Sequence, residues 1–448
     1  MTLTMESTSA ERIVEIREKQ RKYFHSGATL DVKARKAALK KFEQAVLKWE
    51  KPLCDALWTD LHKSYEEAYL TEISILLGEI RTHIRKIGKW TRPQRKCTPL
   101  KLFPSSSRIV SEPLGTALII SPWNYPVQLL LTPLVGAISA GCTAVLKPSP
   151  YVPTVSKVIE DMICDTFPEE YVAVTQGHRD VNGLLLEQRW DMIFFTGSPS
   201  LGRLVMASAA KNLTPVVLEL GGKSPCIIDK DADIRTAAKR VAWGKSLNAG
   251  QTCTALSRFL VPAEKLQTAE ALLKSVLADY PMGDPTDPAT RMGPLISGAQ
   301  FERVREYISS GIREGARLVA GGLPPEPGAD DGWFVPPVVF SDVRPEMRIA
   351  QEEIFGPVLS VMPYNTLEEA LAIADGTQYG LCGAVFGPHE AAVNFARRMR
   401  TGNVYVNDAS RDLAAPFGGF KSSGVGREGG VFGLLEFTEP KAIFEHGS

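Results

Sequence analysis

The sequence lacks the features of a disulfide-bonded, metal-binding or strongly charged protein. Its 448 residues include only six histidines, and its seven cysteines are scattered and form no C-x-x-C pair. Neither a disulfide scaffold nor a metal site is therefore expected, and reduced thiols are typical of a cytoplasmic protein. Lysine plus arginine and aspartate plus glutamate both number 51, so the formal charge is zero. This balance argues against a broad nucleic-acid-binding surface.

The sequence also has no uninterrupted run of apolar residues long enough to suit a membrane. The most apolar region, residues 114–146, is broken by Pro122, Pro126 and Pro133. A membrane span is the poorer interpretation of this region. The N-terminus becomes charged before any apolar run forms, so no signal peptide is expected. We therefore expect a cytoplasmic protein without a membrane span.

The order of apolar segments predicts an α/β protein of two or three domains. Residues 10–90 have the apolar spacing of helices. Short apolar strands at 116–120, 143–147 and 191–197 then alternate with helices, which indicates a parallel sheet covered on both faces. A second α/β stretch begins near Glu219.

Three further segments have a different texture. Residues 98–115 contain two short extended runs around Pro104 and three serines, which predicts a strand pair projecting from the body. Polar loops rich in proline and glycine are expected at 280–298 and 321–337.

One cysteine, Cys253, lies in the small and flexible stretch NAGQTCTALS. Most cysteines of soluble proteins are unreactive core residues. A nucleophilic cysteine needs an accessible thiolate and an electropositive neighbourhood. No histidine lies nearby in the sequence, so a Cys-His dyad is not supported locally.

Three polar residues lie where predicted strands end, the edge at which parallel sheets bind ligands. Asn124 in SPWNYP is suited to donate to an oxygen that becomes negative, or alternatively to form an Asx-turn. Lys147 in LKPSP is suited to hold a ribose or phosphate, or is a solvated surface charge. Glu219 in VVLELGGKSP is a general-base candidate if it lies in a cleft, and otherwise a strand-end carboxylate facing solvent.

A short loop in FFTGSPSLGR, residues 194–203, joins a predicted strand to a helix. Ser198 is a suitable N-cap, and the free N–H groups of such a helix start attract a pyrophosphate. The spacing of Gly197 and Gly202 matches neither G-x-G-x-x-G nor a phosphate-binding P-loop. A plain strand-to-helix turn remains equally open on this segment alone.

Together, seven segments in order resemble the aldehyde dehydrogenase superfamily from about residue 15 to 440. They are SPWNYP, VLKPS, FTGSPSLG, LELGGKSP, NAGQTC, QEEIFGPV and PFGGFKSSG. The resemblance implies a Rossmann-type cofactor domain (1–93 and 116–219) and an α/β catalytic domain (220–410). It also implies oligomerisation elements (94–115 and 430–448) that include the protruding strand pair, and hence a homodimer.

The resemblance further implies NAD(P)-dependent oxidation of an aldehyde to a carboxylic acid, without a metal. Cys253 resembles the nucleophile that forms a hemithioacetal and then a thioester. Asn124 and the backbone N–H of Cys253 resemble the donors to the oxyanion, and Glu219 resembles the base that activates water. The implied cofactor-binding residues are Trp123, Lys147, Gly197, Ser198, Gly202, Glu353 and Phe355.

Two departures from the family pattern affect what the resemblance implies. Pro150 stands where many NAD-preferring relatives have a glutamate that repels a 2′-phosphate, so we predict that NADP is tolerated or preferred. The N-terminal half is most similar to class 3 enzymes, which imply fatty or aromatic aldehydes. The sequence after Cys253 is more similar to the longer, general aldehyde dehydrogenases. Such a mosaic is expected of either a divergent natural branch or an engineered hybrid.

Two other functions stay open at this stage. A CoA-acylating dehydrogenase passes the acyl group to CoA rather than to water, and such enzymes generally lack the carboxylate found here at Glu219. A catalytically silent relative with a structural role is the other alternative, against which an intact set of Cys253, Glu219 and Asn124 weighs.

Overall fold

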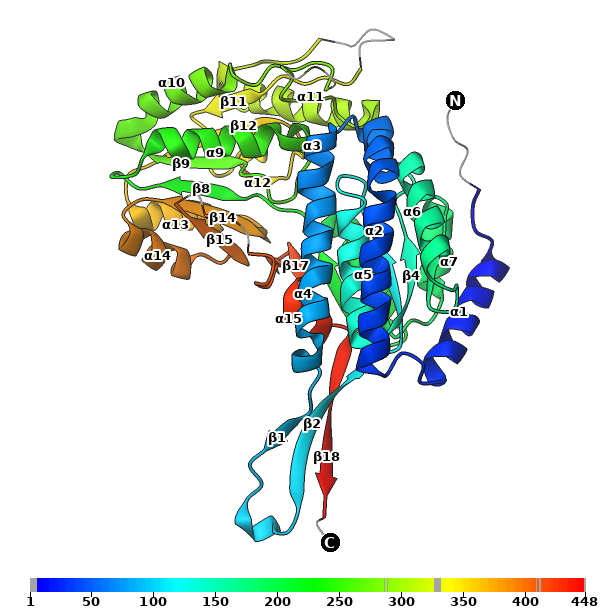
Figure 1. Ribbon diagram of the computed structural model, residues 1–448. Helices are drawn as coiled ribbons and strands as arrows, with labels where there is room; N and C mark the ends of the chain where they lie inside the picture. The colour runs from blue at the N-terminus through cyan, green and yellow to red at the C-terminus, as the bar shows by residue number, and fades with distance from the viewer. Residues whose placement is uncertain are drawn as a thin grey trace.

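The computed structural model describes residues 6–285, 287, 289–325, 332–407, 409–410 and 412–446. Parts of the loops expected at 280–298 and 321–337, and the two ends of the predicted domain ranges, lie outside these residues. The described chain forms two α/β bodies and a projecting arm of strands (Figure 1). The predicted α/β class is confirmed.

The first body is built on a six-stranded sheet of order β17-β7-β6-β3-β4-β5. All neighbouring strands are parallel except β17, which is antiparallel to β7. The strands are β3 (Thr116–Ile120), β4 (Thr143–Lys147), β5 (Val172–Val174), β6 (Met192–Thr196), β7 (Val216–Glu219) and β17 (Gly424–Val425).

Helices cover both faces of this sheet because successive strand residues point to opposite sides. Ala117 and Ile119 of β3 pack into one core with α2, α4, α5 and α6, whereas Leu118 and Ile120 pack into another with α1, α7 and α8. The helices are α1 (Ala10–His25), α2 (Val32–Leu61), α4 (Ser74–Trp90), α5 (Gln128–Ala140), α6 (Pro153–Thr166), α7 (Arg179–Glu187) and α8 (Pro199–Ala210). α3 (Tyr65–Ala68) and the π-helix η1 (Tyr69–Ile73) join α2 to α4.

The second body has a seven-stranded sheet of order β10-β11-β12-β9-β8-β14-β15, in which only β10 is antiparallel to its neighbour. Its strands are β8 (Pro225–Ile228), β9 (Arg258–Pro262), β10 (Arg317–Ala320), β11 (Val338–Ser341), β12 (Val358–Tyr364), β14 (Cys382–Phe386) and β15 (Asn403–Val406). Its helices are α9 (Ile234–Ser246), α10 (Leu266–Leu277), α11 (Gly298–Arg313), α12 (Arg348–Gln351), α13 (Leu367–Asp375) and α14 (His389–Arg398). Short elements complete the chain: η3 (Leu247–Gly250), η4 (Ala263–Lys265), β13 (Tyr379–Gly380), β16 (Phe420–Lys421) and α15 (Gly430–Leu435).

The arm extends away from both bodies (Figure 1). The expected strand pair forms between β1 (Gln94–Lys96) and β2 (Ser106–Pro113), which are joined through η2 (Leu100–Leu102). A third strand, β18 (Thr438–Glu445), pairs with the whole of β2. The C-terminal segment thus completes the arm as a three-stranded antiparallel sheet. Within the described residues, no helix is both long and apolar enough to cross a membrane.

Candidate active site

The loop that carries Cys253 follows α9 through three consecutive left-handed residues. The φ angles are 49° at Asn248, 51° at Ala249 and 73° at Gly250. Left-handed backbone is costly for alanine and is routinely tolerated only by glycine and, less often, asparagine. At Gly250 a side chain would also collide with the backbone carbonyl of Gly356. Backbone strain of this kind, held in place by its surroundings, is typical of functional loops.

The structure places Asn124 against this cysteine loop. Its side chain is only 2% exposed, and Nδ2 donates a hydrogen bond of 3.0 Å to the carbonyl of Gln251. The amide therefore bridges to a loop 127 residues away rather than closing a local Asx-turn. Next to it, the hydroxyl groups of Tyr125 and Thr252 are hydrogen-bonded at 2.8 Å. SPWNYP and NAGQTC thus meet directly beside Cys253.

Glu219, the last residue of β7, is also enclosed, with 4% of its surface exposed. This contradicts the alternative of a solvent-facing carboxylate. The glycines after it allow the backbone to approach the cysteine loop, since a side chain at Gly222 would collide with the carbonyl of Cys253. The N–H of Gly222 donates to the Glu353 carboxylate at 2.9 Å. Glu219, Cys253 and Glu353 are therefore gathered around one glycine turn.

The electrostatics around Cys253 disfavour a thiolate. Desolvation, followed by the negative charge of Glu353 and, further down, of Glu219, raises the pKa of the Cys253 thiol well above its ordinary value. Desolvation likewise raises the pKa of Glu353 to about 7. Burial disfavours the charged form of each group, and neighbouring negative charges add to the effect on the thiol. Burial and the neighbouring carboxylates therefore favour the thiol form of Cys253.

The predicted cofactor residues occupy the carboxyl edge of the six-stranded sheet. Lys147 ends β4 and is 1% exposed, so it is no solvated surface charge; burial lowers its pKa to about 8. Its Nζ donates to the adjacent carbonyl of Pro148 at 2.8 Å. Ser198 caps α8 by accepting the N–H of Leu201 at 3.4 Å.

Two glycines flank this cap in different ways. Gly197 lies between β6 and α8, and its N–H donates to the carbonyl of Glu219 at 2.9 Å. Gly202 lies within the first turn of α8 rather than in the loop, and a side chain there would collide with Leu220. Gly202 therefore permits close packing of the helix on the strand end.

Trp123 and Phe355 pack edge to face, with ring centroids 5.4 Å apart and an interplanar angle of 87°. The Phe355 backbone is left-handed (φ 59°), and its carbonyl accepts a 2.8 Å hydrogen bond from Gln300. A bulky residue in this conformation indicates strain held by its surroundings. The contact joins SPWNYP to QEEIFGPV at the site.

Two parts of the site were not predicted. Phe417 packs with Leu381 and Cys382 in a small apolar cluster that also contacts Cys253. The motif PFGGFKSSG indicated this segment, but no single residue in it. The second part is Lys63, which donates to the carbonyl of Asn124. In the sequence it follows a predicted helix, where lysines are commonly solvated, so no local pattern marks it as part of the site.

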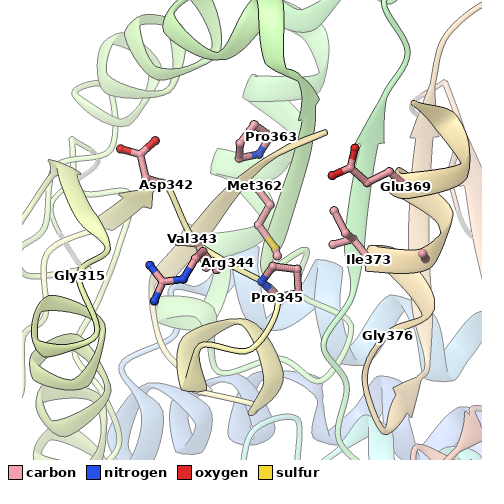
Figure 2. Close-up of a pocket in the computed structure, with 11 residues that line it drawn as sticks. Gly315, Asp342, Val343, Arg344, Pro345, Met362, Pro363, Glu369, Ile373 and Gly376 are labelled. Carbon is pink, nitrogen blue, oxygen red and sulfur yellow. The ribbon is translucent and has the colours of Figure 1, made fainter. Parts of the chain in front are cut away.

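The residues at the sheet edge fit a dinucleotide. A twelve-residue helix begins there with a serine cap, and a buried lysine and the Glu353 carboxylate lie along the same edge. The hydroxyl of Thr196, at the end of β6, is buried and has no hydrogen-bond partner among the described residues. In the described part of the chain, no group of three His, Cys, Asp or Glu side chains is arranged to hold a metal ion. A separate surface cavity lies in the second body beside Arg344 and Glu369, and none of the predicted site residues lines it (Figure 2).

Comparison with known proteins finds relatives along nearly the whole chain. The sequence profile described as "Aldehyde dehydrogenase family" matches residues 1–443. The chain belongs to the aldehyde dehydrogenase family. It is 37% identical over 424 residues to the 4,4'-diaponeurosporen-aldehyde dehydrogenase of Staphylococcus aureus, covering 94% of this chain and 91% of that protein.

Two further relatives extend the comparison of this aldehyde dehydrogenase. Human aldehyde dehydrogenase family 3 member B1 is 36% identical over 426 residues, covering 94% of this chain and 89% of that protein. A mutant aldehyde dehydrogenase C from Pseudomonas syringae, solved in complex with NAD+ and octanal, superposes with a TM-score of 0.91. It is 35% identical and the match covers 98% of this chain and 89% of that one. The human relative agrees with the class 3 likeness, whereas the mosaic character stays a prediction.

Proposed function

We propose that this aldehyde dehydrogenase oxidises hydrophobic, fatty or aromatic aldehydes to carboxylic acids with NAD or NADP, through a thioester on Cys253. The observation that carries the proposal is the meeting of three groups from distant segments. The Asn124 amide and the Cys253 loop are joined through the Gln251 carbonyl. The enclosed Glu219 lies beside the glycine turn that contacts the same loop.

In the proposed mechanism, Cys253 adds to the aldehyde carbon once its proton has passed to a base. Solvent can take this proton because Cys253 is partly exposed, and Glu219 acts only in the second half-reaction. The developing oxyanion is stabilised by the Asn124 amide and the backbone N–H of Cys253. A dinucleotide held by Lys147, Ser198 and Glu353 would supply the hydride acceptor, and loss of hydride from the substrate carbon would leave an acyl group on the sulfur. Glu219 then activates a water molecule that hydrolyses the thioester.

We assign the binding of the dinucleotide to the first body and the cysteine chemistry to the second. The proposed boundaries are 1–93 and 116–219 for the cofactor domain and 220–410 for the catalytic domain. Lys147 would hold the adenine ribose, Gly197, Ser198 and Gly202 would lie near the pyrophosphate, and Glu353 and Phe355 would hold the nicotinamide ribose. Trp123, whose ring packs edge to face against that of Phe355, would lie beside the cofactor.

Several observations support the hydrophobic substrate and the use of NADP. The S. aureus relative is named for 4,4'-diaponeurosporen-aldehyde, and the P. syringae protein was solved with octanal, an aliphatic aldehyde. Phe417 and Leu381 make an apolar wall next to Cys253. Pro150 removes the acidic residue that would repel a 2′-phosphate. NAD+ is the cofactor seen in the P. syringae protein, so NADP use is the finer part of the proposal.

We further propose a cytoplasmic homodimer whose arm, 94–115 with 430–448, pairs with a second copy. Leu100 and Phe103 at the end of the arm are 90% and 80% exposed, as is typical of a surface that a partner covers. The described cysteines are free thiols, as in a reducing compartment.

The deciding experiment is a panel of aliphatic and aromatic aldehydes assayed with NAD and with NADP. Reduced-cofactor formation is followed at 340 nm, and the acid product is identified separately. We expect acid formation without CoA and the highest kcat/KM for long or aromatic aldehydes. Product formation only in the presence of CoA would indicate the acylating alternative, and the absence of turnover would indicate a silent relative.

A further inference from the structure

A buried lysine that the mechanism does not use lies directly behind the proposed oxyanion donor. Lys63 follows α2, where the left-handed His62 (φ 53°) turns the chain inward. Its side chain is 1% exposed, and Nζ donates a hydrogen bond of 2.7 Å to the carbonyl of Asn124. The same Nζ lies 4.0 Å from the ring centroid of Tyr125. The ammonium group therefore contacts two consecutive residues of SPWNYP.

Glu72 neutralises this lysine and holds the other side of the same turn. It lies on the π-helix η1, is 0% exposed, and accepts from Lys63 at 2.6 Å. Its second oxygen accepts the N–H groups of Val127 and Gln128 at 2.8 and 3.1 Å. Single π-helical turns are found frequently at functional sites. The ion pair thus holds residues 124–128 at both ends.

A second acidic residue on the same segment reaches the cysteine loop. Glu67 Oε1 accepts the N–H of Asn248 at 3.0 Å. The Asn248 side chain in turn donates to the carbonyls of Asn124 at 3.1 Å and Gln251 at 3.3 Å. Residues 63–72 therefore hold both halves of the site, which come from different α/β bodies.

The bond between Asn124 and Gln251 sets the orientation of the amide. An amide NH2 group has two donors. One is used on the carbonyl of Gln251, which fixes which atom of the amide is nitrogen and where the second N–H points. That direction depends on the placement of the Asn124 backbone, whose carbonyl Lys63 and Asn248 hold from behind.

We infer that Lys63, paired with Glu72, is a positioning residue that aligns the Asn124 amide with the oxyanion formed at Cys253. The inference rests on the proposed function, because it concerns an oxyanion that forms only during thiol addition. A buried ion pair gives little net stability compared with apolar residues, so a positioning role explains its presence better than stability does.

The test uses Lys63→Met, with Arg35→Met as the matched control. Arg35 is likewise a buried cation, and it donates to the carbonyl of Thr29 and, at the far end of α5, to that of Ser139. We expect Lys63→Met to lower kcat for aldehyde oxidation by roughly 10- to 100-fold, since small misplacements of a catalytic group have effects of this size. The KM for the dinucleotide should change less than twofold, and Arg35→Met should retain kcat within about twofold. The double variant Lys63→Met/Glu72→Gln, which leaves no unpaired buried charge, serves if Lys63→Met does not fold.

Two readouts separate positioning from general damage. In an Asn124→Ala background, Lys63→Met should lower kcat less than twofold further, because the group it positions is already gone. Alkylation of Cys253 by iodoacetamide needs no oxyanion donor, so its rate should be the same in Lys63→Met and the wild-type protein.

Four outcomes would overturn the inference. These are an unchanged kcat in Lys63→Met, equal losses with and without Asn124, an altered alkylation rate, and an equal loss in Arg35→Met. Wild-type protein that oxidises no aldehyde would instead refute the proposed function, so the two failures are distinguishable.

Discussion

Gly222 lies against the backbone carbonyl of Cys253 so closely that no side chain fits between them. The glycine belongs to the turn that follows the Glu219 strand, and the cysteine lies on a loop of the second body. The contact sets how near the proposed base approaches the proposed nucleophile.

The variant Gly222→Ala should therefore displace the Cys253 loop. We expect kcat to fall about 100-fold, because a shift of about 1 Å in a catalytic group has effects of that order. Stopped-flow and steady-state kinetics would measure the loss. Gly244→Ala is a suitable control, since no described atom outside its own helix backbone and chain neighbours lies within 4 Å of a Cβ there. Normal kcat in Gly222→Ala would show that the contact does not constrain the chemistry.

Replacement of the nucleophile should remove the reaction altogether. Cys253→Ala is expected to lower aldehyde oxidation by about 10⁴-fold or more, as loss of a covalent nucleophile does. Cys226→Ala is the control, because Cys226 is buried in β8 and has no predicted role. Near-normal turnover in Cys253→Ala would mean that another group attacks the aldehyde.

Loss of the proposed base should separate the two half-reactions. Glu219→Gln is expected to release one equivalent of reduced cofactor per site in a burst and then to stall as a thioester. Rapid-quench mass spectrometry of the intact chain would detect the acyl adduct on Cys253. If steady-state activity persisted unchanged, a different residue would have to activate the water.

Glu353 should make cofactor binding depend on pH near neutrality. Its pKa is raised to about 7, so the carboxylate that we propose accepts ribose hydroxyl groups is lost as pH falls below that value. We expect the KM for NAD or NADP to rise as pH falls from 8 to 6, and the rise to be absent in Glu353→Gln. A wild-type KM independent of pH across this range would contradict the assignment.

The raised pKa of Glu353 also makes the stability of the folded protein depend on pH. The folded protein binds this proton more tightly than the unfolded chain, so the contribution of Glu353 is present below pH 4.5 and lost as pH rises through 7. Thermal unfolding of Glu353→Gln should depend less on pH over that interval than that of the wild-type protein.

Cofactor choice should respond to position 150. Pro150→Glu restores a carboxylate that repels a 2′-phosphate. We expect kcat/KM for NADP to fall by about 10-fold or more relative to that for NAD, because one like-charge contact costs roughly 1–2 kcal/mol. The ratio measured with one aldehyde is the test, and Pro150→Gln controls for the loss of proline. A strong NAD preference already in the wild-type protein would refute the expectation.

Much of the fold followed from local patterns. The strands at 116–120 and 143–147 lie where apolar runs predicted them. Buried parallel strands are short and almost wholly apolar, so they are visible in a single sequence. The arm was only partly predicted. Its third strand comes from residues 438–445, and pairing with β2 more than 300 residues earlier has no local signature.

The sequence by itself determined the α/β class and the family motifs, and it singled out Cys253 among seven cysteines as the candidate nucleophile. Only the tertiary structure decided how its neighbours meet it: Asn124 through Gln251, Phe417 on its apolar side, and Lys63 behind the amide. The physical reason is that burial and hydrogen bonding depend on segments brought together from across the chain. A lysine after a helix looks solvated until folding places a carboxylate and a carbonyl around its ammonium group.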